Sequence, residues 1–140
     1  MNRSILLVVA IVVVSLASYG QATELEGEWV SMSERTRGIT KIVITSESDG
    51  HVVEAWGKCH PSDCAWGWTA LTRVGKSVED QSFTSGYAIW EPGFASKYVL
   101  LSLDRRMLRV ETINVFKDRS RRSSYRLVEY LRRAGEQTDQ

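Results

Sequence analysis

Alternation between apolar and polar residues is the dominant pattern in this chain, and it predicts short β-strands. Residues 99–103 alternate, a polar turn follows at 104–106, and residues 108–116 alternate again. A period of two places successive side chains on opposite faces of an extended chain. We therefore predict a β-hairpin over residues 99–116.

A second hairpin is predicted earlier in the chain. Residues 39–45 and 51–58 are strand-like, and the turn at 48–50 between them contains the Asp-Gly pair that tight hairpins favour. Near the end of the chain, residues 125–131 fit either a helical stripe or one face of a strand. We prefer the strand for this last segment.

Two further strands complete the prediction of an all-β fold. They cover residues 66–74 and 87–90, with a polar, glycine-containing loop at 75–86 between them. Seven or eight short antiparallel strands joined by tight turns favour a single small meander that closes into a barrel, because closure removes exposed strand edges. We expect Trp29 to plug one end of this barrel. A two-sheet sandwich is the alternative fold.

The amino-terminal residues predict a secretory signal peptide. Arg3 precedes an unbroken apolar stretch from Ile5 to Val14, and the small residues Gly20 and Ala22 suit a cleavage site. Because the stretch is shorter than the roughly 20 residues that span a bilayer, we prefer a cleaved signal to an uncleaved membrane anchor. Export to the periplasm or the extracellular medium follows. The predicted organisation is a signal peptide at 1–22, one barrel-like domain at 23–134 and a flexible tail at 135–140.

The net charge of the chain limits the classes of partner that we expect. Removing Arg3 from the 18 Lys and Arg residues leaves 17, which balance the 17 Asp and Glu residues. A neutral domain gives no general reason for nucleic-acid binding, so we predict no such partner. We also expect no stable membrane insertion once the signal is removed.

One short block concentrates the residues that could carry chemistry. Both cysteines, three of the five tryptophans and one of the two histidines lie between Trp56 and Trp68. In an exported protein, the oxidising compartment favours a disulfide between Cys59 and Cys64. This bond would fix the shape of the loop, and Pro61 would stiffen the loop further.

The alternative interpretation of this block is a zinc or copper site made by Cys59, His60, Asp63 and Cys64, since thiolate and imidazole bind both metals. Neighbouring residues of an extended chain point to opposite sides, so the four side chains do not converge easily on one ion. Export also favours oxidation of the thiols. We therefore predict the disulfide, and no cofactor.

The tryptophans of this block suit either a binding platform or the core. Aromatic rings stack on flat apolar groups, but tryptophan is on average largely buried. We expect at least two of Trp56, Trp66 and Trp68 in the core. The predicted contact surface for a ligand or partner comprises Trp56, Lys58, His60, Asp63 and Trp68, with Arg37 as an anion contact.

No known catalytic constellation is recognisable in the sequence. The motifs of serine hydrolases, zinc peptidases and phosphate-binding loops are missing from it. We expect His51, beside the Asp-Gly turn, to be exposed. His60 has Asp63 as an orienting carboxylate but no nucleophile other than a disulfide-bound cysteine. We therefore name no catalytic residue, and an enzyme is the least favoured function.

The chain resembles a group of mostly bacterial exported proteins with no established activity. The resemblance covers most of the mature chain and rests on GEWV at 27–30, TRGIT at 36–40 and WGKCHPSDC at 56–64, followed by Trp66 and Gly67. It implies a compact β fold and transfers no catalytic residue. The GEW at 27–29 also resembles the start of lipocalin and avidin-like barrels, which implies a small apolar or amphipathic ligand in the barrel mouth.

Two functions are compatible with a disulfide-stapled barrel. We favour a non-catalytic binding module that presents the stapled, tryptophan-rich loop to a partner protein. The alternative is a carrier with a ligand pocket in the barrel mouth. Small barrels are either filled by their own side chains or left open enough for a ligand. An interior cavity therefore distinguishes the two functions.

Overall fold

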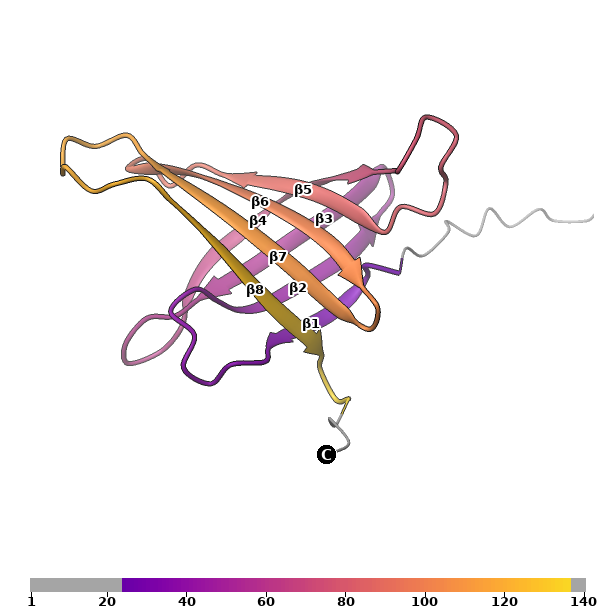
Figure 1. Ribbon diagram of the computed structural model, residues 1–140, viewed down its shortest axis with the longest axis horizontal. Coiled ribbons are helices and arrows are strands. Elements are labelled where there is room, and N and C mark those ends of the chain that lie inside the picture. The colour runs from indigo at the N-terminus through magenta and orange to yellow at the C-terminus, as the bar shows by residue number, and fades with distance from the viewer. Residues whose placement is uncertain (1–23, 137–140) are drawn as a thin grey trace, which may run out of the picture.

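The fold is a closed barrel of eight antiparallel strands (Figure 1). A computed structural model describes residues 24–136, and these residues contain no helix. Each strand pairs with the next along the chain, and the last pairs with the first. The strands are β1 (Gly27–Ser31), β2 (Ile39–Glu47), β3 (Gly50–Gly57), β4 (Cys64–Val74), β5 (Ser85–Trp90), β6 (Ala95–Asp104), β7 (Met107–Phe116) and β8 (Tyr125–Arg133).

The predicted all-β meander is confirmed, and the sandwich alternative is wrong because the β1–β8 pairing closes the sheet. The segment that fits both a helix and a strand forms β8, where it pairs with β7 along seven successive positions from Asn114–Tyr125 to Leu108–Leu131. The predicted signal peptide lies outside the described residues. The described part of the chain holds no helix that could span a membrane.

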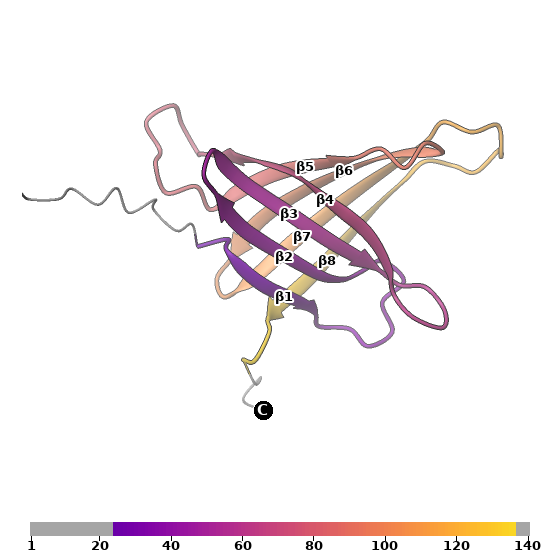
Figure 2. The same ribbon diagram turned by 180° about the vertical axis from the view of Figure 1, so that it is seen from behind.

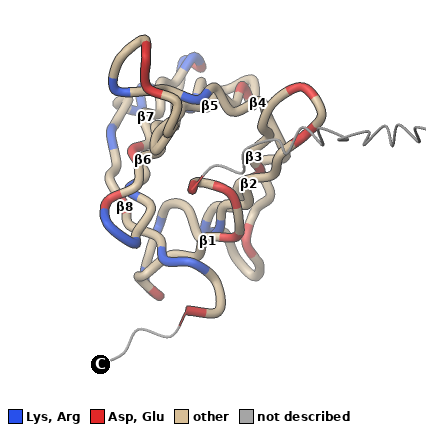
Figure 3. Tube along the Cα trace, turned by 90° about the vertical axis from the view of Figure 1, so that its right-hand side faces the viewer, with Lys and Arg blue, Asp and Glu red and all other residues tan. Residues whose placement is uncertain are grey.

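One end of the barrel is closed by the chain itself. Trp29 is fully buried there, and its indole nitrogen donates to the carbonyl of Leu25, 2.9 Å away. The guanidinium of Arg133 stacks over the Trp29 ring at 4.2 Å and donates to the carbonyl of Glu26. Figure 3 looks onto this end, where the segment before β1 lies within the ring of strands. Trp29 therefore plugs the barrel, as its position in the sequence predicts.

The closed half of the barrel is filled by side chains that point inward from alternate positions of the strands. Aliphatic residues dominate this filling, and most are entirely buried. The core comprises Leu25, Trp29, Ile39, Ile42, Ile44, Val53, Ala55, Leu71, Ala88, Trp90, Val99, Leu101, Leu108, Val110 and Leu131. Ile39 and Trp90 lie towards the other end of the barrel, and the remaining residues make the closed half a conventional hydrophobic core rather than a channel.

His51 is buried, with 8% of its surface exposed, so the expectation of an exposed histidine is wrong. It follows the turn at Gly50, but it occupies the inward face of β3 together with Val53 and Ala55. Its Nε2 lies 2.9 Å from the Glu26 carboxylate, which the segment before β1 brings across the barrel end. The strand face on which a residue lies therefore predicts its burial better than its distance from a turn does.

The other end of the barrel carries four loops. They join β1 to β2, β3 to β4, β5 to β6 and β7 to β8, and they lie together at the left of Figure 1 and at the right of Figure 2. The stapled loop between β3 and β4 is one of the four. These loops surround the mouth of the barrel.

Candidate functional site

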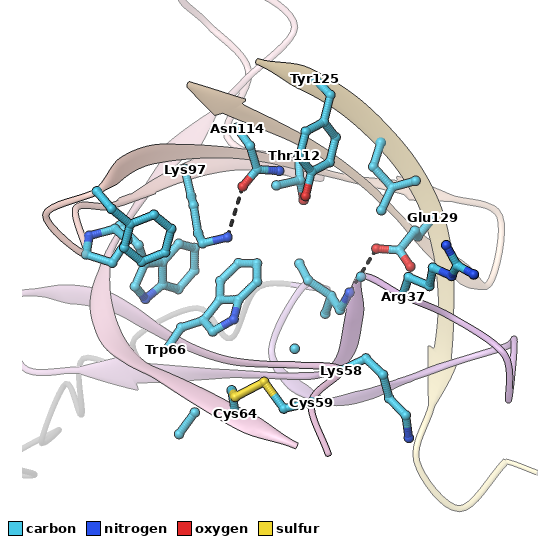
Figure 4. Close-up of a pocket in the computed structure, with 18 of the residues that line it drawn as sticks. Arg37, Lys58, Cys59, Cys64, Trp66, Lys97, Thr112, Asn114, Tyr125 and Glu129 are labelled. Atoms are coloured by element: carbon cyan, nitrogen blue, oxygen red, sulfur yellow. Dashed lines mark hydrogen bonds between the residues drawn. A yellow bond between two sulfur atoms is a disulfide. The ribbon is translucent and has the colours of Figure 1, made fainter. Parts of the chain in front are cut away.

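A cavity of about 490 Å³ occupies the mouth of the barrel. Its volume lies within the roughly 300–1,000 Å³ typical of small-molecule sites. Apolar and aromatic side chains supply much of its wall, and a small number of polar groups face it (Figure 4). The lining includes Arg37, Gly57, Lys58, Cys59, Cys64, Trp66, Trp90, Glu91, Lys97, Thr112, Asn114, Tyr125, Leu127 and Glu129.

The stapled loop forms part of the rim of this cavity. Cys59 and Cys64 form a disulfide, as predicted, with 5.5 Å between their Cα atoms, and both line the cavity. A loop this short gains about 2 kcal/mol from the bond, so its main effect is to fix the shape of the rim. Because both cysteines are bonded to each other, neither offers the thiolate that the alternative metal site would need. Among the described residues, no group of three or more His, Cys, Asp or Glu is placed to hold a metal ion.

Trp66 enters the cavity because β4 contains a β-bulge. In the ladder between β3 and β4, Trp56 pairs with Ala65 and Ala55 pairs with Gly67, so Trp66 is the extra residue. Strict alternation would put Trp66 on the same outer face as Trp68, and the bulge reverses its direction. Gly67 accommodates the distortion with a φ of +79°, which is unfavourable for residues with a side chain.

Replacing Gly67 by alanine is expected to lower the free energy of unfolding by about 1–2 kcal/mol, because only glycine adopts this backbone conformation cheaply. The change should also weaken the near-ultraviolet circular dichroism signal of the tryptophans as Trp66 shifts. Gly93→Ala is the matched control: Gly93 also has a positive φ, +93°, but it sits in an exposed turn. A similar stability loss without the tryptophan signal change is expected there. Equal spectra for the two variants would contradict this role of Gly67.

Tryptophan rings form one wall of the cavity. Trp66 meets Trp90 edge to face, with 5.6 Å between ring centroids. The Trp90 indole nitrogen donates to the carbonyl of Gly67 at 2.9 Å, which ties this wall to the bulge. Gly57 lies beneath Trp66, where a Cβ atom would come within 2.7 Å of the indole nitrogen. The bulge and the missing Cβ together give Trp66 a defined position.

The facing wall carries polar side chains from β6, β7 and β8. Lys97 pairs across the sheet with Asn114, and Asn114 pairs with Tyr125, so the three side chains form a row (Figure 4). The Lys97 ammonium donates to the Asn114 side-chain oxygen at 2.9 Å and lies 4.3 Å from the centroid of the Trp66 ring. Thr112 lies one inward position deeper along β7. Donor groups therefore cluster on this side of the cavity.

Burial lowers the pKa of Lys97 below the 10.5 of an ordinary lysine. The cause is loss of hydration, which disfavours the charged form. No carboxylate among residues 24–136 lies within ion-pair distance of its ammonium, although Trp66 contributes a cation–π contact. Lys97 is thus a partly desolvated cation whose polar protein contact is with a neutral amide.

The two carboxylates that line the cavity are already engaged. Glu129 accepts hydrogen bonds from the Thr36 hydroxyl and, at 2.9 Å, from the backbone nitrogen of Ile39, which fastens the β1–β2 loop to β8. Glu91 accepts from Lys117 at 2.5 Å and from Ser96, and these two donors lower its pKa. Neither carboxylate is paired with Lys97.

The structure separates the residues of the predicted contact surface. Lys58 and Arg37 lie at the cavity rim, but their charged ends point away from the interior (Figure 4). Lys58 forms an ion pair with Asp63 at 3.7 Å, and His60 is exposed in the same loop. Trp56 and Trp68 are outside the cavity.

The expectation that at least two of the three block tryptophans belong to the core is wrong. Trp68 is 75% exposed on the outer face of β4. Trp56 is half-buried on the outer face of β3, where the Lys41 ammonium covers its ring at 4.0 Å. Only Trp66 packs against the core cluster. The bulge explains this separation, because it turns one tryptophan inward and leaves its neighbours outside.

The polar wall of the cavity is absent from the sequence-based prediction. A signal for it exists: Thr112 and Asn114 continue the inward face of Leu108 and Val110, so this strand changes from apolar to polar towards the mouth. Lys97 occupies the corresponding inward position of β6. Comparison of the chain with protein-family models, with curated proteins and with solved structures found no match.

Proposed function

We propose that this protein is a binding protein that holds a small amphipathic organic molecule in the mouth of its barrel. The observation that carries the proposal is the asymmetry of the barrel interior. One half is filled by its own side chains around Trp29, while the other encloses a cavity of about 490 Å³. Aromatic and aliphatic walls would hold the apolar part of a ligand, and a small number of fixed polar groups would orient it.

The rigidity of the mouth supports this proposal. The disulfide fixes one part of the rim, and the Glu129 hydrogen bonds to Thr36 and Ile39 fix another. A preorganised site loses less conformational entropy when a ligand binds. The disulfide also suits the oxidising compartment of an exported protein, so we place the binding function in the periplasm or outside the cell.

Filling the cavity is expected to weaken binding strongly. Leu127 lines the cavity, and Leu127→Trp would project an indole into it. Titration with N-phenylnaphthylamine, a neutral fluorescent probe, should show saturable binding to the wild type and at least about a tenfold loss of affinity, equivalent to about 1.4 kcal/mol, in the variant. Leu100→Trp adds the same ring on the outer face of β6, where Leu100 is 44% exposed, and should leave the affinity unchanged.

Failure of the wild type to bind the probe, or equal effects of the two leucine variants, would contradict a cavity ligand. Urea unfolding of both variants checks that Leu127→Trp remains folded. A variant that is folded and fails to bind supports the proposal.

The second candidate function is recognition of a partner protein by the outer surface beside the stapled loop. The observation that favours it is the exposure of Trp68, because exposed tryptophans are common anchors of protein interfaces. The two candidates respond to different variants. Binding of a protein partner should be lost in Trp68→Ala and kept in Leu127→Trp, whereas binding of a cavity ligand should show the reverse.

A further inference from the structure

We infer that the ligand of the mouth cavity carries a carboxylate, and that the Lys97 ammonium binds this group with the help of Thr112 and Asn114. This inference rests on the proposed function, since it assigns the chemistry of the ligand's polar end. The apolar remainder of the ligand would lie against Trp66 and Leu127. Three observations support the assignment.

The first observation is the environment of Lys97. A protonated lysine has three hydrogens to donate. The Asn114 oxygen accepts one at 2.9 Å, and the Trp66 ring lies on another side of the ammonium. Bringing a cation partly out of water is costly unless an anion or several acceptors compensate. No carboxylate of the described residues compensates Lys97, so an anionic ligand would supply the missing charge.

The second observation is an unpaired buried hydroxyl on the same wall of the cavity. Thr112 is 3% exposed, and its Oγ1 has no hydrogen-bond partner among residues 24–136. Buried polar atoms are nearly always hydrogen-bonded, so an exception needs an explanation. Thr112 lines the cavity, and Figure 4 places it beside Asn114 and close to the inward-pointing end of Tyr125. A carboxylate oxygen at this point would accept a hydrogen bond from the threonine hydroxyl.

The third observation is the balance of charge around the cavity. Glu91 and Glu129 carry negative charge and line the same cavity as Lys97. Arg37 and Lys58 also line it, but their charged ends point away from the interior. Glu91 is offset by Lys117, and Glu129 accepts a hydroxyl and a backbone N–H. Among residues 24–136 that line the cavity, Lys97 is the one cation that points inward, and one positive charge suits a monoanion better than a doubly charged phosphate. The geometry therefore favours a carboxylate.

The test compares two probes that share an alkyl chain and differ in the polar end. Decanoate and decanol each compete with N-phenylnaphthylamine for wild-type protein, for Lys97→Met and for the control Lys41→Met. Lys41 lies on the outer face of β2, over Trp56. Lys97→Met is expected to weaken decanoate binding roughly 10- to 100-fold, the range for a hydrogen bond to a charged group, and to leave decanol binding within a few fold. Lys41→Met should change neither affinity.

The outcomes separate the two proposals. If decanol and decanoate both bind but Lys97→Met weakens them equally, the carboxylate assignment is overturned and the cavity function stands. If decanoate fails to compete while decanol competes, the assignment is also overturned. If neither probe competes and N-phenylnaphthylamine itself does not bind, the proposed function fails. Thr112→Val is a second variant of nearly unchanged volume, and a selective loss of decanoate affinity in it would support the inference.

Discussion

Replacing Trp29 by alanine is expected to lower the free energy of unfolding by about 3–5 kcal/mol, the usual cost of removing a fully buried tryptophan. Trp29 is 0% exposed, its indole nitrogen donates to Leu25, and Arg133 stacks over its ring. The variant would lose the packing of the plug and leave the Leu25 carbonyl without this donor. Much of the stability of a domain of this size would be lost.

The matched control is Trp68→Ala, which removes the same side chain from a site that is 75% exposed. Its effect should stay within about 0.5 kcal/mol, as for other surface substitutions. Urea unfolding followed by far-ultraviolet circular dichroism measures both variants on one scale. Comparable losses from the two tryptophans would mean that the closed end of the barrel does not anchor the fold.

The residues that stabilise this barrel and the residues that we assign to binding lie at opposite ends of it. The plug around Trp29 and the aliphatic core fill the closed half, so the mouth does not need to be filled for the protein to fold. The loops at the mouth are fixed instead by local bonds, namely the disulfide and the hydrogen bonds of Glu129 and Glu91. Changes of residues that face the cavity should therefore alter binding more than stability.

Most of the fold could be predicted because alternation depends only on local sequence. Seven strands from residue 39 onward are predicted from alternation, β-branched residues and turn signals, and each is present as β2 to β8. β1 shows no alternation, because its apolar residues Trp29 and Val30 are adjacent. Its pairing with β8 joins the two ends of the chain, and no local pattern specifies such a contact. Closure was therefore predicted from the general cost of exposed edges rather than from particular residues.

The candidate site was harder to predict because it depends on register and on one bulge. Lys97, Asn114 and Tyr125 lie on three strands, and only the pairing of these strands places their side chains in one row. Trp66 and Trp68 look equivalent in the sequence, and the bulge alone separates them. The stapled loop was identifiable since its cysteines are close in sequence. Its contribution to the site, however, is a rim and not the polar wall.

The affinity for decanoate is expected to depend on pH, because Lys97 of the polar wall must be protonated to bind a carboxylate. Only the protonated form of Lys97 attracts a carboxylate, and burial lowers its pKa below 10.5. Affinity should hold at neutral pH and then fall as the pH rises through the pKa of Lys97. The decline should approach tenfold per pH unit and end at the roughly 10- to 100-fold contribution of the charged contact. Decanol binding should not follow this profile.

The unliganded protein should show the opposite trend in stability. Because folding lowers the pKa of Lys97, the unfolded chain binds this proton more tightly, so this group makes the folded state more stable as the pH rises towards 10.5. Stability that rises while decanoate affinity falls excludes general alkaline unfolding as the cause of weaker binding.

The other charged and titratable groups at the cavity set the control for this experiment. Besides Lys97, the charged or titratable side chains that line the cavity are Arg37, Lys58, Glu91, Tyr125 and Glu129. Because these groups face the same ligand site, the titration must be repeated with Lys97→Met. This variant should bind decanoate weakly and with no dependence on pH. An alkaline decline that persists in Lys97→Met would assign the effect to another group and remove Lys97 from carboxylate recognition.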